Sequence, residues 1–452
     1  LQLYCDGIAE TDKLADNSGI YDLTAAQVMN FYCTTGSVPA NFEGGFIEIS
    51  SDNVHVVYIP IGSLDTFIPL DTEGTSNSYI ADRGAASYSF TATIMGNGAD
   101  GIIDEGKFED ASGNILTKAG GANIHPLSAK LLWQDTDELV EQVGLSDGKV
   151  QVKMGRSRGN ALIAVYDKAN PNAEDAKVLW SWHLWCTPVP QIIECATSIY
   201  TGNNYKVMDR NLGATTSEPN LGTTQGLHYQ FGRKDPFSGS LSYDGERTIL
   251  YDVRSSTSIL KAEIIDEAIQ IRQALNFPDI YFLRHSDQED WYEGVGAHYL
   301  WGNPEGRASV HPVKTTKTIY DPCPAGYKIL PGDVFFVFAR TTKPSEYSNE
   351  IICKVENLNS LFYVKKIEDG GTTFYADGAG VDETKLIYLP LAYSPQWAAG
   401  KLHSSGYYWT SSPRGDDLWY QGFTFYNQSG STYWLNNGLP SWRLASVRCV
   451  KE

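Results

Sequence analysis

The chain has 452 residues, a formal net charge of −19, 42% hydrophobic residues and 20% charged residues. At roughly 100 to 200 residues per domain, this length predicts two to four domains, and the composition excludes a disordered chain. The negative charge disfavours nucleic acid and anionic membrane surfaces as partners, because both require clusters of Lys and Arg. No apolar run approaches the roughly 20 residues of a transmembrane helix, so we expect no transmembrane segment.

The 42 glycines and 27 tyrosines favour short strands that are joined by turns. Apolar runs bounded by turn residues indicate a small β region over residues 1–70, which is either separate or part of a sandwich. Over residues 88–94, apolar side chains occupy every second position, which predicts a strand with one buried face. Further strands are expected at residues 149–154, 161–166 and 178–185. Antiparallel strands at this spacing are typical of a β-sandwich, which we expect over residues 71–188.

A stiff connector follows, because Pro188 and Pro190 both fix the backbone angle φ and both lack an N–H donor. We therefore place a domain boundary there, and the third domain covers residues 189–452. Within it, apolar side chains recur at intervals of three or four between Ser258 and Pro278, which predicts one amphipathic helix. The apolar positions are Leu260, Ile264, Ala268, Ile271 and Leu275. The last domain is therefore expected to be α+β.

The chain begins at Leu1, so we expect that a leader was removed or that the numbering begins inside a longer precursor. Seven cysteines are too few for a disulfide scaffold, and the absence of Cys-x-x-Cys spacing argues against a zinc ribbon or a thioredoxin-type site. Cys186 and Cys195 flank the connector and could form a pair. The sequence alone leaves that pairing open.

Four segments of the last domain carry an ordered pattern. They are 206–214 (Lys-Val-Met-Asp-Arg-Asn-Leu-Gly-Ala), 226–237, 317–327 and 442–450. In this order they resemble the FISUMP-type "major paralogous" domain of secreted bacterial surface proteins, which belongs with the C-type-lectin-like folds. Shorter matches at 290–291, 300–302 and 408–412 extend the resemblance to about residues 195–452. It implies a lectin-like α+β domain.

The preceding region is similar to the β-sandwich found before such domains in fimbrillin-like proteins of the Bacteroides group. The similarity is carried by residues 78–81, 95–98, 159–164 and 179–185. It implies a pilus subunit at the tip of a fimbrium on the bacterial cell surface. The resemblance further implies that the N-terminal sandwich contacts other pilus subunits. The last domain would face outward and bind a glycan or a host surface protein.

Two polar clusters in these segments invite a catalytic interpretation, because an arginine can hold a neighbouring carboxylate ionised. Such clusters more often tie loops together through bidentate hydrogen bonds, and we expect that structural role here. The clusters are Asp209, Arg210 and Asn211, and Arg233, Lys234 and Asp235.

The resemblance also implies a disulfide between Cys323 and Cys449, because C-type-lectin-like domains commonly tie their last strand back in this way. Closing a loop of about 125 residues would stabilise the fold by about 4 to 5 kcal/mol in the chain-entropy model. The alternative is two buried free thiols.

Glu218, Pro219 and Asn220 match the tripeptide that mannose-type C-type lectins use with calcium, because carboxylate and amide oxygens bind the ion and sugar hydroxyls. In those lectins the tripeptide lies in a late loop, whereas here it comes early. Calcium is therefore not supported, and we expect no metal and no other cofactor.

Aromatic residues are dense between positions 393 and 442. Flat rings can stack on sugar faces while neighbouring amides supply directional hydrogen bonds. Trp409 and Trp442 lie in family-typical strands and are expected in the core. The expected ligand-binding residues are Trp397, Trp419, Tyr420, Trp434, Asn436 and Asn437.

Catalytic motifs are missing from the sequence. The eight histidines are scattered, and neither a His-Glu-x-x-His nor a Gly-x-Ser-x-Gly motif occurs. We therefore expect no enzyme, and the family resemblance implies an adhesin. Two alternatives remain open: a purely structural pilus subunit without a ligand, and a secreted carbohydrate-active or formylglycine-generating enzyme, the latter requiring a reactive thiol pair.

Overall fold

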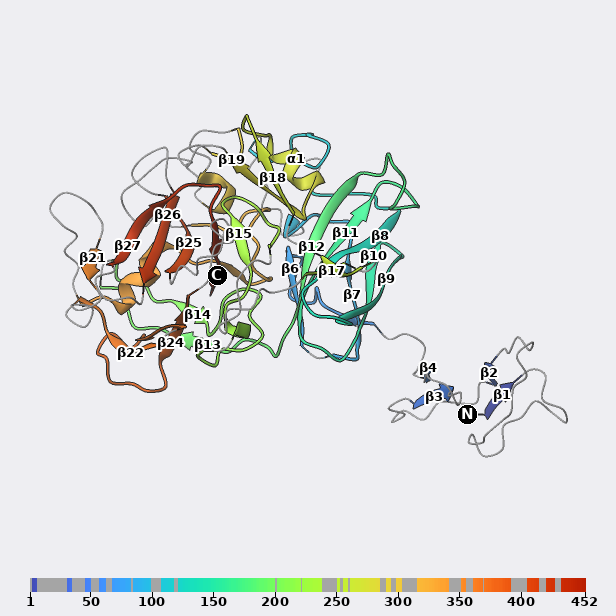
Figure 1. The fold of residues 1–452 in the computed structure, drawn as a ribbon, viewed down its shortest axis with the longest axis horizontal. Helices are drawn as coiled ribbons and strands as arrows, with labels where there is room; N and C mark the ends of the chain where they lie inside the picture. Colours follow the sequence, from blue (N-terminus) through green and yellow to red (C-terminus); the bar gives the residue numbers. More distant parts are fainter. Residues whose placement is uncertain are drawn as a thin grey trace. The chain divides into compact units, whose positions relative to one another are not determined.

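The structure is a computed structural model, which Figure 1 shows as a ribbon. It describes residues 2–5, 31–34, 45–49, 57–61, 67–82, 84–98, 107–117, 121–199, 201–220, 222–237, 250–252, 255–258, 261–284, 290–293, 298–302, 315–340, 351–354, 361–368, 370–391, 405–413, 420–426 and 432–452. The protein is mainly β, as the composition predicts. No helix in these ranges combines the length and the apolar character needed to cross a membrane.

The chain divides into two compact units, Leu1–Thr66 and Phe67–Glu452. The first unit contains two antiparallel strand pairs. These are β1 (Gln2–Cys5) with β2 (Phe31–Thr34), and β3 (Gly45–Ile49) with β4 (Val57–Ile61). The connector at Pro188 and Pro190 lies inside the second unit, so the domain division at this point does not separate two compact bodies.

Two sheets dominate residues 67–188, which we call the two-sheet region (Figure 1). One sheet has the order β5 (Ile68–Pro69), β7 (Ser87–Thr91), β10 (Lys149–Met154) and β9 (Val140–Ser146). The other has the order β17 (Ser255–Ser258), β16 (Leu250–Asp252), β8 (Ser128–Gln134), β11 (Gly159–Tyr166), β12 (Val178–Cys186) and β6 (Ser78–Ala81). Tyr88 and Phe90 of β7 pack in one core with Ile163 and Trp182 of the second sheet. The alternation predicted over residues 88–94 therefore faces this core.

Strand β11 is buried along its whole length, which explains its continuous apolar sequence. Ala161 and Ile163 face the core between the two sheets. Leu162 faces the opposite side and packs in a cluster with Trp301 and Trp409, from the C-terminal region (residues 189–452). The outer face of the second sheet is thus covered by the C-terminal region, and we call this buried contact the seam.

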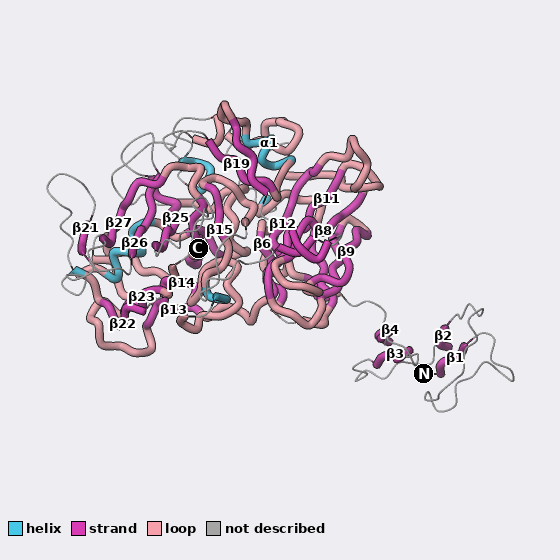
Figure 2. Tube along the Cα trace, viewed as in Figure 1, coloured by secondary structure: helices cyan, strands magenta, loops and turns pink. Residues whose placement is uncertain are grey.

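The described residues of the C-terminal region form four sheets of their own and short helices, and Figure 2 shows how much of the chain lies in strands and loops. The first sheet has the order β13 (Ile192–Glu194), β14 (Lys206–Met208), β29 (Cys449–Lys451) and β20 (Tyr327–Ile329). The second has the order β15 (His228–Gln230), β28 (Leu444–Ser446), β25 (Ser405–Pro413), β26 (Tyr420–Tyr426), β27 (Thr432–Leu439) and β21 (Ile351–Lys354). The third and fourth consist of β22 (Val364–Glu368), β23 (Gly371–Tyr375) and β24 (Leu386–Pro390), and of the parallel pair β18 (Lys261–Ile265) and β19 (Ile280–Arg284). The described helices are α1 (Ile271–Asn276) and the 3₁₀ helices η3 (Gly222–Thr224), η4 (His298–Trp301) and η5 (Gly332–Phe338).

The prediction of one helix between Ser258 and Pro278 is wrong over most of that segment. Residues 261–265 form β18, which pairs in parallel with β19, and the helix is confined to Ile271–Asn276. Adjacent Ile264 and Ile265 are β-branched and suit a strand, so the available partner strand overrides the helical spacing. The helix that remains buries Ala274 and Leu275.

The cysteines whose side chains the structure describes are one bonded pair and two buried thiols. Cys323 and Cys449, which the family resemblance pairs, are joined by a disulfide with Cα atoms 5.9 Å apart. The suggested pairing of Cys186 with Cys195 is wrong, because both are free thiols that pack in different core clusters. Burial raises the pKa of Cys186 to about 11 and that of Cys195 to about 12.

Candidate functional site

The predicted aromatic ligand site lies largely outside the described residues. Trp397 and Trp419 fall outside them entirely. Tyr420 begins β26, and Trp434, Asn436 and Asn437 belong to β27, but the structure describes only the backbone of these four residues. Their role in ligand binding stays a prediction. Trp409 and Trp442 are buried, which confirms the prediction that they belong to the core.

Asp209 and Arg210 lie at the seam and form a bidentate ion pair. Arg210 Nε donates to Asp209 Oδ1 at 2.8 Å, and Arg210 Nη2 donates to Asp209 Oδ2 at 2.9 Å. Arg210 Nη1 also donates to Thr187 Oγ1 at 3.2 Å and to the Thr215 carbonyl at 3.3 Å. The guanidinium therefore ties the end of the two-sheet region to a loop of the C-terminal region.

Asn211 continues this network into the core. Its Nδ2 donates to the Gln225 carbonyl at 3.0 Å, and its Oδ1 accepts a hydrogen bond from Arg448 Nε at 2.9 Å. Arg448 is fully buried and also donates to the carbonyls of Met208 and Tyr388. Arg448 was not singled out from the sequence. An arginine within the apolar segment 444–450 could have indicated a buried side chain that links elements through hydrogen bonds.

Lys234, Asp235 and Ser181 form a second buried polar cluster at the seam. Lys234 Nζ lies 2.6 Å from Asp235 Oδ1, and Ser181 Oγ donates to the same oxygen at 2.6 Å. The Lys234 ammonium also lies 4.5 Å from the centre of the Trp180 ring. Burial lowers the pKa of Lys234 to about 8, although the charge of Asp235 acts in the opposite direction.

A serine beside a lysine of lowered pKa is an arrangement used in nucleophilic catalysis. Here the cavity next to Lys234 measures only about 10 Å³, which is no larger than one water molecule. A substrate has no room to reach Ser181, so the cluster is structural. Arg233 is structural as well, because it donates to the carbonyls of Ala274, Phe277 and Ile280 around the end of α1.

A buried hydrogen-bond network around His183 also lies at the seam. It was not predicted from the sequence. His183 Nδ1 lies 3.0 Å from Ser78 Oγ, and His183 Nε2 lies 2.9 Å from Asn160 Oδ1. Asn160 Nδ2 in turn donates to Asp135 Oδ2 at 2.6 Å. Ser78 Oγ donates to the Pro322 carbonyl at 2.6 Å, so it is engaged and fully buried. This network therefore joins the two regions, and its serine is not accessible as a nucleophile.

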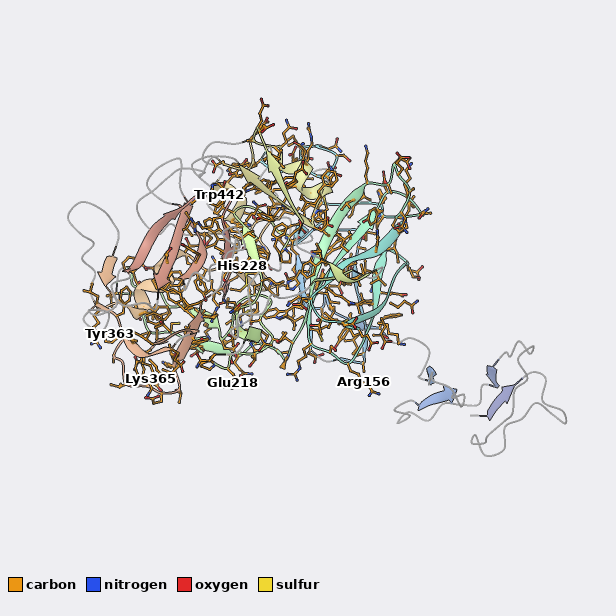
Figure 3. The ribbon with its side chains drawn as sticks, in the orientation of Figure 1. Arg156, Glu218, His228, Tyr363, Lys365 and Trp442 are labelled. Atoms are coloured by element: carbon orange, nitrogen blue, oxygen red, sulfur yellow. A yellow bond between two sulfur atoms is a disulfide. The ribbon has the colours of Figure 1, made fainter. Side chains whose placement is uncertain are left out.

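The calcium-type tripeptide is engaged in protein contacts. Asn220 Nδ2 donates to Glu368 Oε1 at 2.9 Å, and the Asn220 backbone N–H donates to the Tyr388 hydroxyl at 3.3 Å. Glu218 is exposed at the periphery of the unit, whereas His228 lies in the interior (Figure 3). Within the described ranges, no group of three or more His, Cys, Asp or Glu side chains is placed to hold a metal ion.

An open groove of about 710 Å³ lies at the end of the first C-terminal sheet, and we call it the lysine groove. Strand β29 runs between β14 and β20 in this sheet. Each of these three strands contributes one lysine to the groove. The lining residues are Asn203, Asn204, Tyr205, Lys206, Thr315, Lys328, Pro331, Val450, Lys451 and Glu452.

A buried carboxylate fixes the aromatic wall of the lysine groove. Asp333 accepts hydrogen bonds from the Tyr205 hydroxyl and from Ser198 Oγ, both at 2.7 Å, and another from Thr201. Burial and the charge of Asp333 raise the pKa of Tyr205, so the phenol stays protonated and remains a donor. Tyr205 is partly buried against the core and also lines the groove.

Two side-chain amides stand beside this ring. Asn203 Nδ2 donates to the Tyr205 hydroxyl at 3.3 Å. Asn204 Oδ1 accepts a hydrogen bond from Thr197 Oγ1 at 2.7 Å, and no acceptor among the described residues engages its NH₂ group. Asn204 therefore presents an oriented donor at the wall of the groove.

A second groove of about 610 Å³ lies between the two-sheet region and α1. Its apolar lining includes Leu132, Tyr166 and Phe277, and Phe277 is 51% exposed. Its lining also includes the amides of Gln273 and Asn276, but Asn276 Nδ2 already donates to the carbonyls of Ala111 and Arg272. We therefore take the lysine groove, where Asn204 presents an oriented donor beside the fixed Tyr205, as the better candidate site.

Comparison of the chain with protein-family models, with curated proteins and with solved structures finds no match. The functional argument therefore depends on the residues of this chain.

Proposed function

We propose that the protein is a cell-surface adhesin whose C-terminal region binds a glycan. One observation carries this proposal: the lysine groove combines the fixed ring of Tyr205 with the amides of Asn203 and Asn204. A sugar ring presents an apolar face that stacks on an aromatic ring, and hydroxyls around its edge that pair with amides. The groove volume lies within the range typical of pockets for small organic ligands.

At the level of the fold, we interpret the two-sheet region as a fimbrillin-like β-sandwich and residues 189–452 as a FISUMP-type, C-type-lectin-like domain. The disulfide between Cys323 and Cys449 and the return of β29 to β14 support this interpretation. The corresponding role is that of a fimbrial tip subunit at the bacterial cell surface. Its sandwich would contact other pilus subunits, and its last domain would contact a glycan or a host surface protein.

The proposal is tested by screening the full chain against an array of neutral and acidic glycans, followed by titration of the best ligand. Tyr205→Ala is expected to weaken binding about tenfold, because it removes the stacking ring. Tyr205→Phe keeps the ring and is expected to retain most of the affinity. Tyr363→Ala provides a matched control, because Tyr363 is also part-buried but lies outside the groove (Figure 3). Equal affinities of the wild type and Tyr205→Ala would rule out this groove as the site.

A purely structural pilus subunit is the first alternative, and it predicts that no glycan in the screen binds. The second alternative is an enzyme of the formylglycine-generating type, which requires a reactive thiol pair. Among the cysteines whose side chains the structure describes, Cys323 and Cys449 are bonded to each other, and the raised pKa values of Cys186 and Cys195 make both thiols poor nucleophiles. None of these four residues supplies a reactive thiol pair. Rapid modification of Cys186 and Cys195 in the native protein, located by peptide mapping, would instead favour the enzyme.

A further inference from the structure

The lysine groove differs in charge from the chain as a whole. The chain holds 54 acidic and 35 basic residues, with a formal net charge of −19. Among the ten residues that line the groove, three are lysines and one is the acidic Glu452. Positive charge is therefore gathered at one place on an acidic protein.

The pairing of the strands produces this concentration. Val207 of β14 pairs with Val450 of β29, so the antiparallel register sets Lys206 beside Lys451 across the two strands. On the other side of β29, Lys328 pairs with Val450. Cross-strand neighbours have Cβ atoms about 4.5 to 5.5 Å apart, and like charges in such positions are destabilising. A bound anionic group would relieve that repulsion.

The lysines are only partly neutralised by the protein. Lys206 Nζ lies 2.5 Å from Glu194 Oε1, and both side chains are more than half exposed. Lys328 Nζ donates to the carbonyl of Thr315 at 2.5 Å. Lys451 is exposed and forms no ion pair with any residue that the structure describes. An anionic ligand would therefore meet Lys451 directly and Lys206 through an exposed ion pair that solvent already screens.

We propose that the lysine groove binds an acidic glycan, in which a carboxylate or sulfate group contacts Lys206 and Lys451 while the adjoining sugar ring stacks on Tyr205. This inference rests on the proposed function, because it assumes that the groove takes a sugar. A volume of about 710 Å³ exceeds the need of a simple inorganic ion and matches an organic ligand. At physiological salt, charges are screened beyond about 8 Å, so the local lysines outweigh the distant acidic residues.

The ligand class is tested by calorimetric titration of the full chain with three probes. Oligogalacturonate supplies carboxylates, dextran sulfate supplies sulfates, and dextran supplies neutral sugar alone. We expect at least one acidic probe to bind more tightly than dextran, and its affinity to fall when NaCl is raised from 50 to 300 mM. The double variant Lys206→Gln/Lys451→Gln is expected to bind that probe about tenfold more weakly, since two exposed ionic contacts are lost.

The control variant is Lys149→Gln/Lys153→Gln, which removes the same charge from β10. Lys153 forms a comparable exposed ion pair with Glu141 at 2.8 Å, far from the groove in sequence and in a different sheet. Its affinity is expected to stay within about twofold of the wild type. If neither acidic probe binds more tightly than dextran, or if the groove variant binds the acidic probe as tightly as the wild type, the inference is overturned and glycan binding is left intact. Failure of every probe and of the wider glycan screen overturns the proposed function itself.

Discussion

His183 shows how burial alone can set the chemistry of one side chain. It is fully buried at the seam with Ser78 and Asn160 as partners, and burial lowers its pKa to about 3. The imidazole is therefore neutral in the folded protein at neutral pH. In the unfolded chain its pKa is about 6.5, so unfolded molecules take up a proton that folded molecules exclude.

A pH dependence of stability follows from this difference. The folded pKa lies below the unfolded pKa, so the stabilisation is present above pH 6.5 and is lost as the pH falls toward 3. Between pH 7.5 and pH 5, the wild type is expected to lose about 2 kcal/mol of unfolding free energy from this residue.

Urea unfolding of the wild type and His183→Gln at both pH values measures the loss, because all other titrating groups are common to both proteins. The gap in unfolding free energy between them should narrow at pH 5. A constant gap contradicts the argument. His125→Gln, which changes an exposed histidine, controls for the substitution itself.

At the level of elements, strand β29 is held by three kinds of contact. It pairs with β14 and β20, its Val450 packs in the core, and its Cys449 is bonded to Cys323. Because the lysine groove includes Lys451 at the end of this strand, the position of β29 determines the geometry of the groove.

The disulfide is expected to stabilise this arrangement substantially. The bonded residues are 126 positions apart, and a loop of that size corresponds to about 5 kcal/mol in the chain-entropy model. The free energy of unfolding of Cys323→Ala/Cys449→Ala should therefore be lower by about that amount, and the variant should unfold at a lower denaturant concentration. Reduction of the wild type should produce a similar shift, whereas the variant should respond little to reductant. A variant as stable as the oxidised wild type would show that the bond contributes nothing.

Much of the strand content could be predicted from the sequence, and the site could not. Strand β10 has the predicted bounds 149–154, because its alternation agrees with its burial. The helix was mistaken at 261–265 because the partner strand β19 lies beyond the local pattern. Lys206 and Lys451 come together only through strand pairing across more than 200 positions, which no local motif reveals.

At the level of the whole molecule, the seam makes residues 67–452 one cooperative body. Leu162 and Trp185 of the two-sheet region pack in the same cluster as Trp301 and Trp409 of the C-terminal region. Buried polar contacts add specificity, because Lys234 and Asp235 of the C-terminal region would both lose Ser181 of the two-sheet region as a partner if the regions separated. We therefore expect the two regions to unfold together in calorimetry.

A substitution within the seam tests this coupling. Lys234→Met removes one partner of a buried ion pair and leaves Asp235 uncompensated, which is expected to cost about 3 to 5 kcal/mol. Lys153→Met breaks the exposed pair with Glu141 and is expected to cost no more than about 1 kcal/mol. Denaturant unfolding measures both losses. Similar effects of the two substitutions would show that the seam lysine is not a structural tie.

The position of β29 between β14 and β20 also determines when this sheet can form during synthesis. Strand β14 ends at residue 208, yet its neighbour β29 is synthesised about 240 residues later, so this sheet cannot be completed until β29 has been made. The chain must remain incompletely folded until residue 451 is available, and only then do the disulfide and the groove form. A chain that stops before residue 449 therefore lacks the disulfide, the middle strand of this sheet and one wall of the groove.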